Sequence, residues 1–182
     1  MKKYELTGEV KVKFGVTFKR IRALIDFGNV KKGELGGFIE KEENLSHENN
    51  AWVYDDAFVS GNADVYDDAW VYGNAWVYGD AWVYGNAKVS GNARVSGNAE
   101  VSGNAEVSGN ADYVLIGRVG SRFGFTTFFR NKNNEIYVSC GCFLGTLAKF
   151  RKKVKETHGT DTKYAKVYQA AADLAEMQIL NK

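Results

Sequence analysis

The 182-residue chain contains no proline, only two cysteines and only two histidines. Disordered linkers often contain proline, so its absence favours a chain that is ordered nearly throughout. Cys140 and Cys142 are poorly spaced for a disulfide framework, which is typical of a reducing cytoplasm. No apolar run is long enough to cross a membrane, and the first residues alternate in polarity, unlike a secretory signal. We therefore expect a cytoplasmic protein with no membrane partner.

A large excess of charge of one sign is also absent, because the net charge is only +2. The charges are nevertheless unevenly distributed. Residues 51–111 hold two basic and eight acidic residues, a net charge of −6, whereas residues 112–182 hold twelve basic and six acidic residues, a net charge of +6. Anionic partners are therefore expected at the C-terminal part of the chain and not in its middle.

Ten consecutive hexads of the form A-x-V-x-[GD]-[ND] follow one another from Ala51. An α-helix would place residues six apart on different sides, and one continuous strand could not carry turn residues at every sixth position. The repeat therefore predicts a solenoid in which each short strand is followed by a corner. Three hexads would complete a triangular coil about 4.8 Å above the last, with a common interior lined by the valines from Val53 to Val107. Glycine and asparagine suit the corners because they tolerate left-handed backbone angles.

Aromatic side chains occupy the outward positions of the early hexads, whereas the late hexads carry charged residues and serine. So many exposed rings would form a large apolar surface. We therefore expect the N-terminal segment or other subunits to cover them, and a ladder that only stiffens each face is the alternative. The residues expected at a subunit interface are Trp52, Trp70, Trp76, Trp82, Tyr72 and Tyr78.

The segment before the repeat alternates in polarity around Gly15. This pattern predicts that residues 1–44 form an N-terminal cap built on a β-hairpin with one apolar face. The solenoid is assigned to residues 45–112, with residues 45–50 as a degenerate first hexad.

The segment after the repeat loses the six-residue period. Residues 113–182 predict a C-terminal α+β module with strands followed by two helices. Thr146 is expected to cap the first helix, Gly159 to end it, and Asp161 to cap the second. The predicted fold class is thus mainly β, a hexapeptide solenoid between a β cap and an α+β module.

Motifs outside the repeat resemble those of hexapeptide-repeat proteins encoded by phages and prophages. The motifs lie at residues 20–24, 32–40, 120–122, 126–130, 138–143, 145–147 and 156–159. With the hexads, they resemble the left-handed parallel β-helix superfamily over nearly the whole chain. The resemblance implies a left-handed solenoid and a homo-oligomer, with a trimer favoured. A phage origin would favour a role against host defence.

Enzymes of this superfamily depend on histidine. Its acyltransferases use a histidine near a subunit boundary, and its carbonic anhydrases bind zinc with three. Here residues 51–110 contain no histidine and no insertion, and only His47 and His158 exist. Cys140 and Cys142 are expected to be small buried side chains. We therefore expect no metal, no cofactor and no enzymatic activity; an acyltransferase-like enzyme that uses His158 or a cysteine is the alternative.

The basic C-terminal module carries the best candidate binding site. Arg122 and Arg130 are an even number of residues apart, so one strand would place both on the same face, where guanidinium groups suit a phosphate. Neighbouring phenylalanines could stack a base, although they could equally be core beside a solvated lysine face. The candidate ligand-binding residues are Ser121, Arg122, Thr126, Thr127, Arg130, Lys149 and His158.

These features together predict a non-enzymatic, phage-type binding protein on an oligomeric scaffold. Its expected ligand is a nucleotide-like or phosphorylated small molecule that it sequesters. A host defence protein, bound through the basic module or the aromatic residues, is the alternative partner. Nucleic acid is less favoured because the solenoid is acidic.

Overall fold

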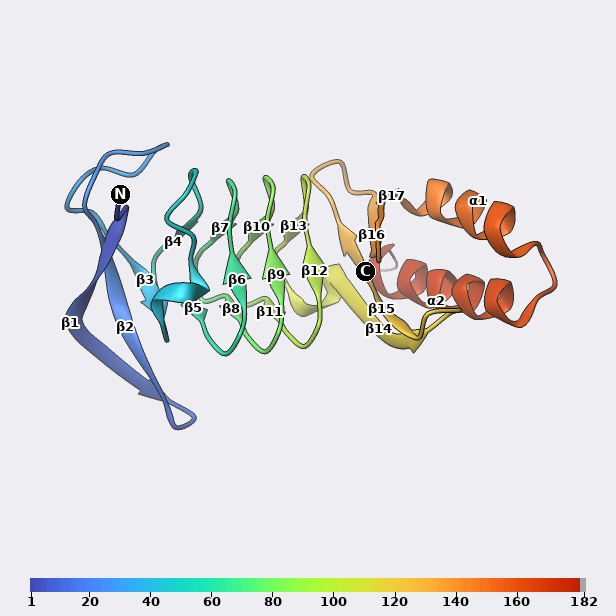
Figure 1. Cartoon of the computed structure of the whole chain (residues 1–182), viewed down its shortest axis with the longest axis horizontal. Coiled ribbons are helices and arrows are strands. Elements are labelled where there is room, and N and C mark those ends of the chain that lie inside the picture. The colour runs from blue at the N-terminus through green and yellow to red at the C-terminus, as the bar shows by residue number, and fades with distance from the viewer. Residues whose placement is uncertain (181–182) are drawn as a thin grey trace.

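The computed structural model describes residues 1–180 and shows an elongated molecule with three parts in a row (Figure 1). A β cap lies at one end, a parallel β-solenoid forms the middle, and a module of strands and two helices lies at the other end. The predicted fold class is confirmed. No helix within residues 1–180 has both the length and the hydropathy needed to cross a membrane.

The solenoid consists of ten two-residue strands arranged in three parallel sheets, which share the three faces of the coil. The strands are β4 (Trp52–Val53), β5 (Phe58–Val59), β6 (Asp64–Val65), β7 (Trp70–Val71), β8 (Trp76–Val77), β9 (Trp82–Val83), β10 (Lys88–Val89), β11 (Arg94–Val95), β12 (Glu100–Val101) and β13 (Glu106–Val107). Each valine lies beside the valine one coil further on, as Val53 does beside Val71. All ten of these valines are fully buried, so the predicted common interior is confirmed. Burial of each valine side chain contributes roughly 1.5 kcal/mol or more.

The corners of the coils depend on left-handed backbone conformations. Gly73 and Gly85, for example, have φ angles of 70° and 69°. Asp55 and Asp67 adopt the same conformation where the repeat has aspartate in place of glycine, with φ angles of 53° and 56°. Their carboxylates accept hydrogen bonds from the backbone N–H groups of Gly73 and Gly85 in the next coil, at 2.9 and 3.2 Å. Aspartate lacks the conformational freedom of glycine at these corners, but its side chain adds a hydrogen bond between neighbouring coils.

The coil begins earlier in the chain than the regular hexads indicate. In β3 (Leu35–Ile39), Ile39 pairs in parallel with Val59, and Leu45 bridges Val65 after the 3₁₀ turn η1 (Glu42–Asn44). Both separations are 20 residues (59 − 39 and 65 − 45), two more than the regular 18 (77 − 59). The prediction of a degenerate hexad at residues 45–50 was therefore wrong, because Leu45 already fills a valine position and two extra residues follow it.

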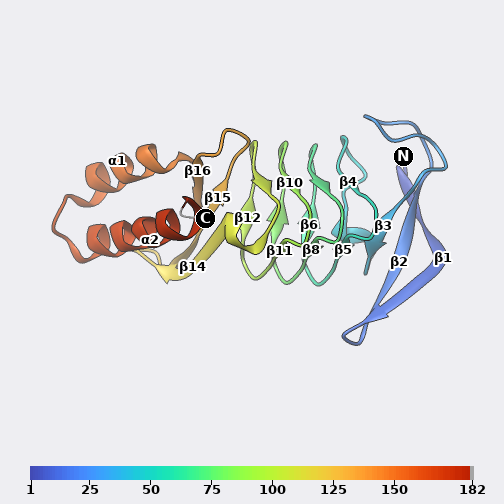
Figure 2. The same ribbon diagram turned by 180° about the vertical axis from the view of Figure 1, so that it is seen from behind.

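The cap continues one sheet of the solenoid. β1 (Tyr4–Lys13) and β2 (Val16–Ala23) form an antiparallel hairpin, and β2 pairs with β3. The resulting strand order is β1-β2-β3-β5-β8-β11. Because the hairpin extends sideways from the coil axis, it projects from one side of the molecule (Figures 1 and 2).

Polar side chains secure the end of the solenoid under the cap. The buried Lys3 ammonium donates hydrogen bonds to the carbonyl oxygens of Glu48, Asn49 and Ala51, at 3.2, 3.3 and 2.9 Å. The three donors of an ammonium group match three carbonyl acceptors that the end of the coil would otherwise leave buried.

His47 belongs to the same closure. Its Nδ1 accepts the backbone N–H of Lys3 at 3.1 Å, and its Nε2 lies 2.8 Å from Glu42 Oε1. The ring also stacks on Tyr4, with centroids 4.3 Å apart. Because both ring nitrogens have protein partners, His47 is a packed structural residue.

The cap covers Trp52. This ring is fully buried and packs against Tyr4, Phe27 and Tyr54. The expectation that Trp52 lies at a subunit interface was therefore wrong, because its own N-terminal segment occupies that surface.

The remaining aromatic side chains are covered to different extents. Trp76 packs against Phe14 and Phe18 of the hairpin, and Trp70 and Tyr72 are half-buried. Trp82 is 50% exposed and Tyr78 is 38% exposed. The surface left for another subunit is thus centred on the last two residues.

The C-terminal module is a four-stranded antiparallel sheet covered by two helices. Its elements are the 3₁₀ turn η2 (Asn110–Asp112), β14 (Tyr113–Val119), β15 (Gly124–Arg130), β16 (Ile136–Cys140), β17 (Phe143–Thr146), α1 (Leu147–His158) and α2 (Lys163–Leu180). One face of the sheet packs on the helices and the other closes the solenoid, as Figures 1 and 2 show from opposite sides. Phe128 accordingly joins the core under the helices, and Phe129 joins the core of the solenoid.

The helix boundaries follow local capping. Thr146 Oγ1 accepts the backbone N–H of Lys149 at 3.3 Å, which confirms Thr146 as the cap of α1. Gly159 ends α1, as predicted. For α2 the cap is Thr162, whose Oγ1 accepts the N–H of Ala165 at 3.2 Å. The prediction of Asp161 was therefore one residue too early.

Candidate functional site: the thiol pocket

The sheet of the C-terminal module presents alternate side chains to opposite faces. Thr126 and Cys140 are paired across β15 and β16. Their neighbours Thr127 and Ser139 point toward the solenoid, where both form hydrogen bonds with Glu100. Thr126 and Cys140 consequently face the helices.

A pocket of about 300 Å³ opens between this sheet and the two helices. Phe125, Phe143 and Phe150 form apolar parts of its wall. The polar residues that line it are Ser121, Arg122, Cys140, Cys142, Lys153, Thr157, His158 and Tyr168. We call it the thiol pocket, because both cysteine side chains line it.

The Cys140 thiol lies between two hydroxyl groups. Thr126 Oγ1 donates a hydrogen bond to Cys140 Sγ at 3.2 Å, and the Tyr168 hydroxyl is hydrogen-bonded to the same side chain. Burial, and to a smaller extent the neighbouring Cys140, raise the pKa of Tyr168 to about 12, while Arg122 opposes the shift. Tyr168 therefore keeps its proton near neutral pH and can donate it in a hydrogen bond to negative charge on the sulfur.

Tyr168 is held in this position by its neighbours. Its ring stacks with His158, with centroids 5.7 Å apart, and meets the edge of Phe150 at the same distance. Gly120, with a φ angle of 73°, lies directly against the Tyr168 hydroxyl, and a Cβ atom there would overlap it. The tyrosine can approach Cys140 because this position carries no side chain.

Two cations flank the opening of the pocket. Arg122 lies in the turn between β14 and β15, and Lys153 lies on α1. Both side chains are exposed, and the ion pairs found within residues 1–180 involve neither of them. The mouth is therefore electropositive, in agreement with the net charge of the C-terminal segment.

This arrangement combines three chemical capacities. The cationic mouth can bind an anionic group, and the phenylalanines can bind an apolar one. The thiol can act as a nucleophile, and the imidazole of His158 can act as a general base. No group of three or more histidine, cysteine or acidic side chains that could hold a metal ion occurs within residues 1–180.

The structure brings together four of the residues that the sequence singled out. Ser121, Arg122 and His158 line the thiol pocket, and Thr126 contacts Cys140. They come from a turn, the end of α1 and a central strand, so the sheet and the helix must both be in place before they meet.

Arg130 lies elsewhere, and the expectation that it shares a strand face with Arg122 was wrong. β15 begins at Gly124, after Arg122, so the spacing rule for a strand does not apply between them. The Arg130 guanidinium instead donates to the Asp112 carboxylate at 3.0 Å and to the carbonyl oxygen of Ile179. The guanidinium of Arg130 therefore forms contacts within the protein and does not contribute to the pocket.

Two other predicted site residues also lie away from the pocket. Thr127 Oγ1 accepts the backbone N–H of Glu100 at 3.0 Å. Lys149 is exposed in the first turn of α1 and is not among the residues that line the pocket. Phe128 and Phe129 are fully buried, so neither can stack a base.

Sequence reasoning missed Tyr168 and Lys153 and undervalued Cys140. Tyr168 belongs to the buried face of its helix, which gave no reason to expect a role in binding. Several lysines follow one another on α1, and the sequence does not show which of them faces the pocket. The available signal was the even spacing that puts Thr126 and Phe128 on one face of a strand, because a buried Phe128 would place Thr126 on the buried face as well. No local pattern relates Cys140 to Tyr168, because 28 residues separate them (168 − 140).

Comparison with known proteins supports the architecture. A family model described as "YdcK Beta solenoid repeat" matches residues 57–73, 69–85 and 87–103, all within the solenoid. The Escherichia coli (strain K12) protein "Uncharacterized acetyltransferase YdcK" is 36% identical over 63 residues. That alignment covers 30% of this chain and 19% of the relative, so this chain spans only about a fifth of that protein. The chain is a β-solenoid repeat protein.

The same comparison corrects one expectation from the sequence. The absence of histidine from the repeat favoured a protein without enzymatic activity. The relative is named as an acetyltransferase, which contradicts that expectation and points toward an enzyme.

Proposed function

We propose that this protein is an acyltransferase whose reaction takes place in the thiol pocket, with Cys140 as the residue that accepts the acyl group. The observation that carries this proposal is the position of the Cys140 thiol, which is hydrogen-bonded by Thr126 and Tyr168 beneath an electropositive mouth. The name of the Escherichia coli relative adds support for the class of reaction.

The substrate is proposed to be a thioester that carries phosphate groups. A volume of about 300 Å³ suits the acyl end and the adjoining chain of such a donor but not a whole nucleotide. The phosphate groups would remain at the mouth, where Arg122 and Lys153 supply unpaired positive charge. Phe125 and Phe143 provide apolar surface for the acyl chain.

In the first step the Cys140 thiol gives its proton to His158, which lines the same pocket, and the sulfur attacks the carbonyl carbon of the thioester. A bond forms between Cys140 Sγ and that carbon, and the bond from the carbon to the donor sulfur breaks. The departing thiolate takes the proton back from His158.

In the second step an acceptor nucleophile attacks the acyl group on Cys140 and gives its proton to His158. The bond between Sγ and the carbonyl carbon breaks, and the departing Cys140 thiolate takes that proton from His158. The hydroxyls of Thr126 and Tyr168 donate to the sulfur whenever it carries negative charge, which lowers the barrier to both steps.

Mass spectrometry of the intact protein tests this proposal. Incubation with acetyl-coenzyme A is expected to add one acetyl group to the native protein and to Cys142→Ala, but not to Cys140→Ala. Cys142 is the matched control because it lines the same pocket, and its thiol is more exposed than that of Cys140. Absence of the adduct with acetyl, butyryl and longer acyl donors, or equal labelling of Cys140→Ala, would refute the assignment.

A further inference from the structure

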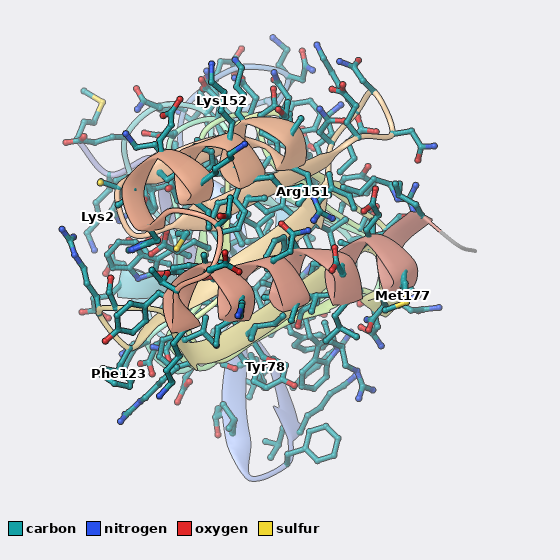
Figure 3. All side chains as sticks on the ribbon, turned by 90° about the vertical axis from the view of Figure 1, so that its right-hand side faces the viewer. Lys2, Tyr78, Phe123, Arg151, Lys152 and Met177 are labelled. Carbon is teal, nitrogen blue, oxygen red and sulfur yellow. The ribbon has the colours of Figure 1, made fainter. Side chains whose placement is uncertain are left out.

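A second concave site lies at the other end of the molecule, where the tip of the β1–β2 hairpin faces β8 and β11. The groove between them has a volume of about 290 Å³. We call it the hairpin groove; it is lined by Lys13, Phe14, Phe18, Trp76, Tyr78 and Arg94. Tyr78 lies on the side of the molecule from which the hairpin projects (Figure 3).

Two further hollows adjoin the hairpin groove. Arg94 also borders a neighbouring hollow that contains Asn74 and Asn92, and a third hollow that contains Ser96 and Tyr113. The three hollows therefore adjoin one another around the Arg94 side chain. A linear molecule fits this shape better than a compact one.

The tip of the hairpin is strained in a way that folding does not require. Phe14 and Gly15 are the two residues of the turn, with φ angles of 51° and 78°. Two-residue turns with positive φ at both positions favour asparagine followed by glycine, and a bulky aromatic residue at φ > 0 is an outlier. Phe14 also leaves 88% of its surface exposed. Phe14 is thus unfavourable for the turn, and its side chain buries too little surface to compensate. This combination points to a role in binding and not in the stability of the fold.

Phe14 is nevertheless directed at another ring. Its centroid lies 5.5 Å from that of Trp76, at an interplanar angle of 66°. Trp76 and Tyr78 both line the groove. Three rings around one depression provide apolar platforms on which a ring with C–H groups on its face can lie.

The polar groups of the groove select a particular chemistry. Arg94 is exposed, and within residues 1–180 neither it nor Lys13 is found in an ion pair. Asn74 and Asn92 stand one coil apart on an adjacent corner and offer amide donors and acceptors. Two cations, amides and aromatic platforms together match a chain that bears hydroxyl groups and an occasional carboxylate.

Two other linear ligands fit less well. A single-stranded nucleic acid carries a charge at every phosphate, whereas the groove offers two cations on a solenoid with a net charge of −6 over residues 51–111. An extended peptide would need a free strand edge, but the backbone groups of β8 already pair with coils on both sides, as Trp76 and Tyr78 do with Ala93 and Val95.

We propose that the hairpin groove binds a linear acidic oligosaccharide, with a sugar ring stacked on the exposed Phe14 and a carboxylate bound by Arg94. The rise of one solenoid coil, about 4.8 Å, is close to the length of one sugar residue, so two neighbouring sugar residues of the glycan can lie over β8 and β11. This inference concerns a surface separate from the thiol pocket and does not depend on the proposed acyl transfer.

Calorimetric titration with short oligogalacturonates and oligosialates tests the proposal, with neutral cello-oligosaccharides for comparison. At least one acidic series is expected to bind, and the neutral series to bind at least about tenfold more weakly. Failure of both acidic series to bind at millimolar concentration would overturn the proposal. Equal binding of neutral sugars, or preferential binding of a single-stranded oligonucleotide or an acidic peptide, would overturn it too.

The decisive variant is Phe14→Asn, which replaces the strained residue with the one that the turn prefers. It is expected to leave the melting temperature unchanged or raise it while weakening glycan binding about tenfold. Arg94→Gln is expected to weaken acidic but not neutral glycans, and Arg118→Gln, an exposed arginine of the C-terminal module, is the matched control without effect. Unchanged binding in both groove variants, or a loss of stability in Phe14→Asn that accounts for the weaker binding, would overturn the proposal.

Discussion

The guanidinium of Arg130 donates a hydrogen bond to the carboxylate of Asp112 at 3.0 Å, where the last coil of the solenoid meets the C-terminal module. Asp112 is 1% exposed and also accepts hydrogen bonds from the backbone N–H groups of Ser108 and Gly109. Arg130 further donates to the carbonyl oxygen of Ile179 near the end of α2. One ion pair therefore connects the coil, the sheet and the second helix.

Arg130→Ala is expected to destabilise the protein by about 3–5 kcal/mol, because it removes the guanidinium that pairs with the buried Asp112 carboxylate. Urea unfolding followed by circular dichroism measures the change. The control is Arg151→Ala, which removes a more accessible pair with Asp173 and Glu176 and should cost about 1 kcal/mol or less. Equal losses in the two variants would show that the Arg130 pair has no special role.

Gly120→Ala is expected to displace Tyr168, because the added Cβ would overlap the tyrosine hydroxyl and the backbone there is left-handed. Overpacking of this kind costs about 1–3 kcal/mol, and the displaced hydroxyl should slow acylation of Cys140. Melting temperature and the rate of acyl labelling measure the two effects. Tyr168→Phe separates them, since it removes the hydroxyl without adding an overlap. Unchanged labelling in both variants would mean that Tyr168 does not assist the thiol.

The buried lysine under the cap predicts an unusual dependence of stability on pH. Burial lowers the pKa of Lys3 from 10.5 in the unfolded chain to about 8 in the folded protein, with a smaller opposing effect of Asp68. The unfolded state therefore binds more protons between these values, and the free energy of unfolding should rise with pH from 8 to about 10. The slope from this group is at most about 1.4 kcal/mol per pH unit.

Above about pH 10 this gain is opposed by Tyr4, whose pKa is raised in the folded state by burial and by nearby carboxylates, Glu42 first among them. A raised tyrosine pKa stabilises the fold at lower pH, and that contribution is lost as the pH rises. Chemical unfolding at several pH values measures the profile. Lys3→Met should remove the rise between pH 8 and 10, and a rise that persists in this variant would assign it to another group.

The exposed aromatic residues of the solenoid predict self-association. Trp82 and Tyr78 remain 50% and 38% exposed in the single chain, and within residues 1–180 the Trp82 ring forms none of the ring contacts found with the cap. Burial of such rings between subunits would be favourable. Light scattering is expected to show a trimer, and Trp82→Arg to shift it toward the monomer. If the native protein is monomeric, the prediction is wrong, and the rings only stiffen the faces of the solenoid by stacking.

The solenoid was predictable because its information is local and repeated. Ala51 and Val53 recur every six residues, and any shift of register would expose a valine, so each coil is aligned by the one before it. The start of the coil was not predictable, because two extra residues after Leu45 break the period where the repeat is weakest.

The candidate site was predictable only in part. Composition indicated that the C-terminal module is basic, and the sequence marked Ser121, Arg122, Thr126 and His158, which the structure brings together around the thiol pocket. Arg130 was marked for the same reason, yet its guanidinium is taken up by Asp112. A charged side chain is free or paired according to neighbours that are distant in sequence.

By itself, then, the sequence determined the coil, its buried face and the signs of the net charge on the solenoid and on the C-terminal module, since these depend on period and composition. The tertiary structure alone decided that Cys140 meets Tyr168, that Trp52 lies under the cap and that Phe14 stands over Trp76. Each of these contacts joins segments that only packing brings together: two helices on a sheet in the first case, and a hairpin folded beside the coil in the other two.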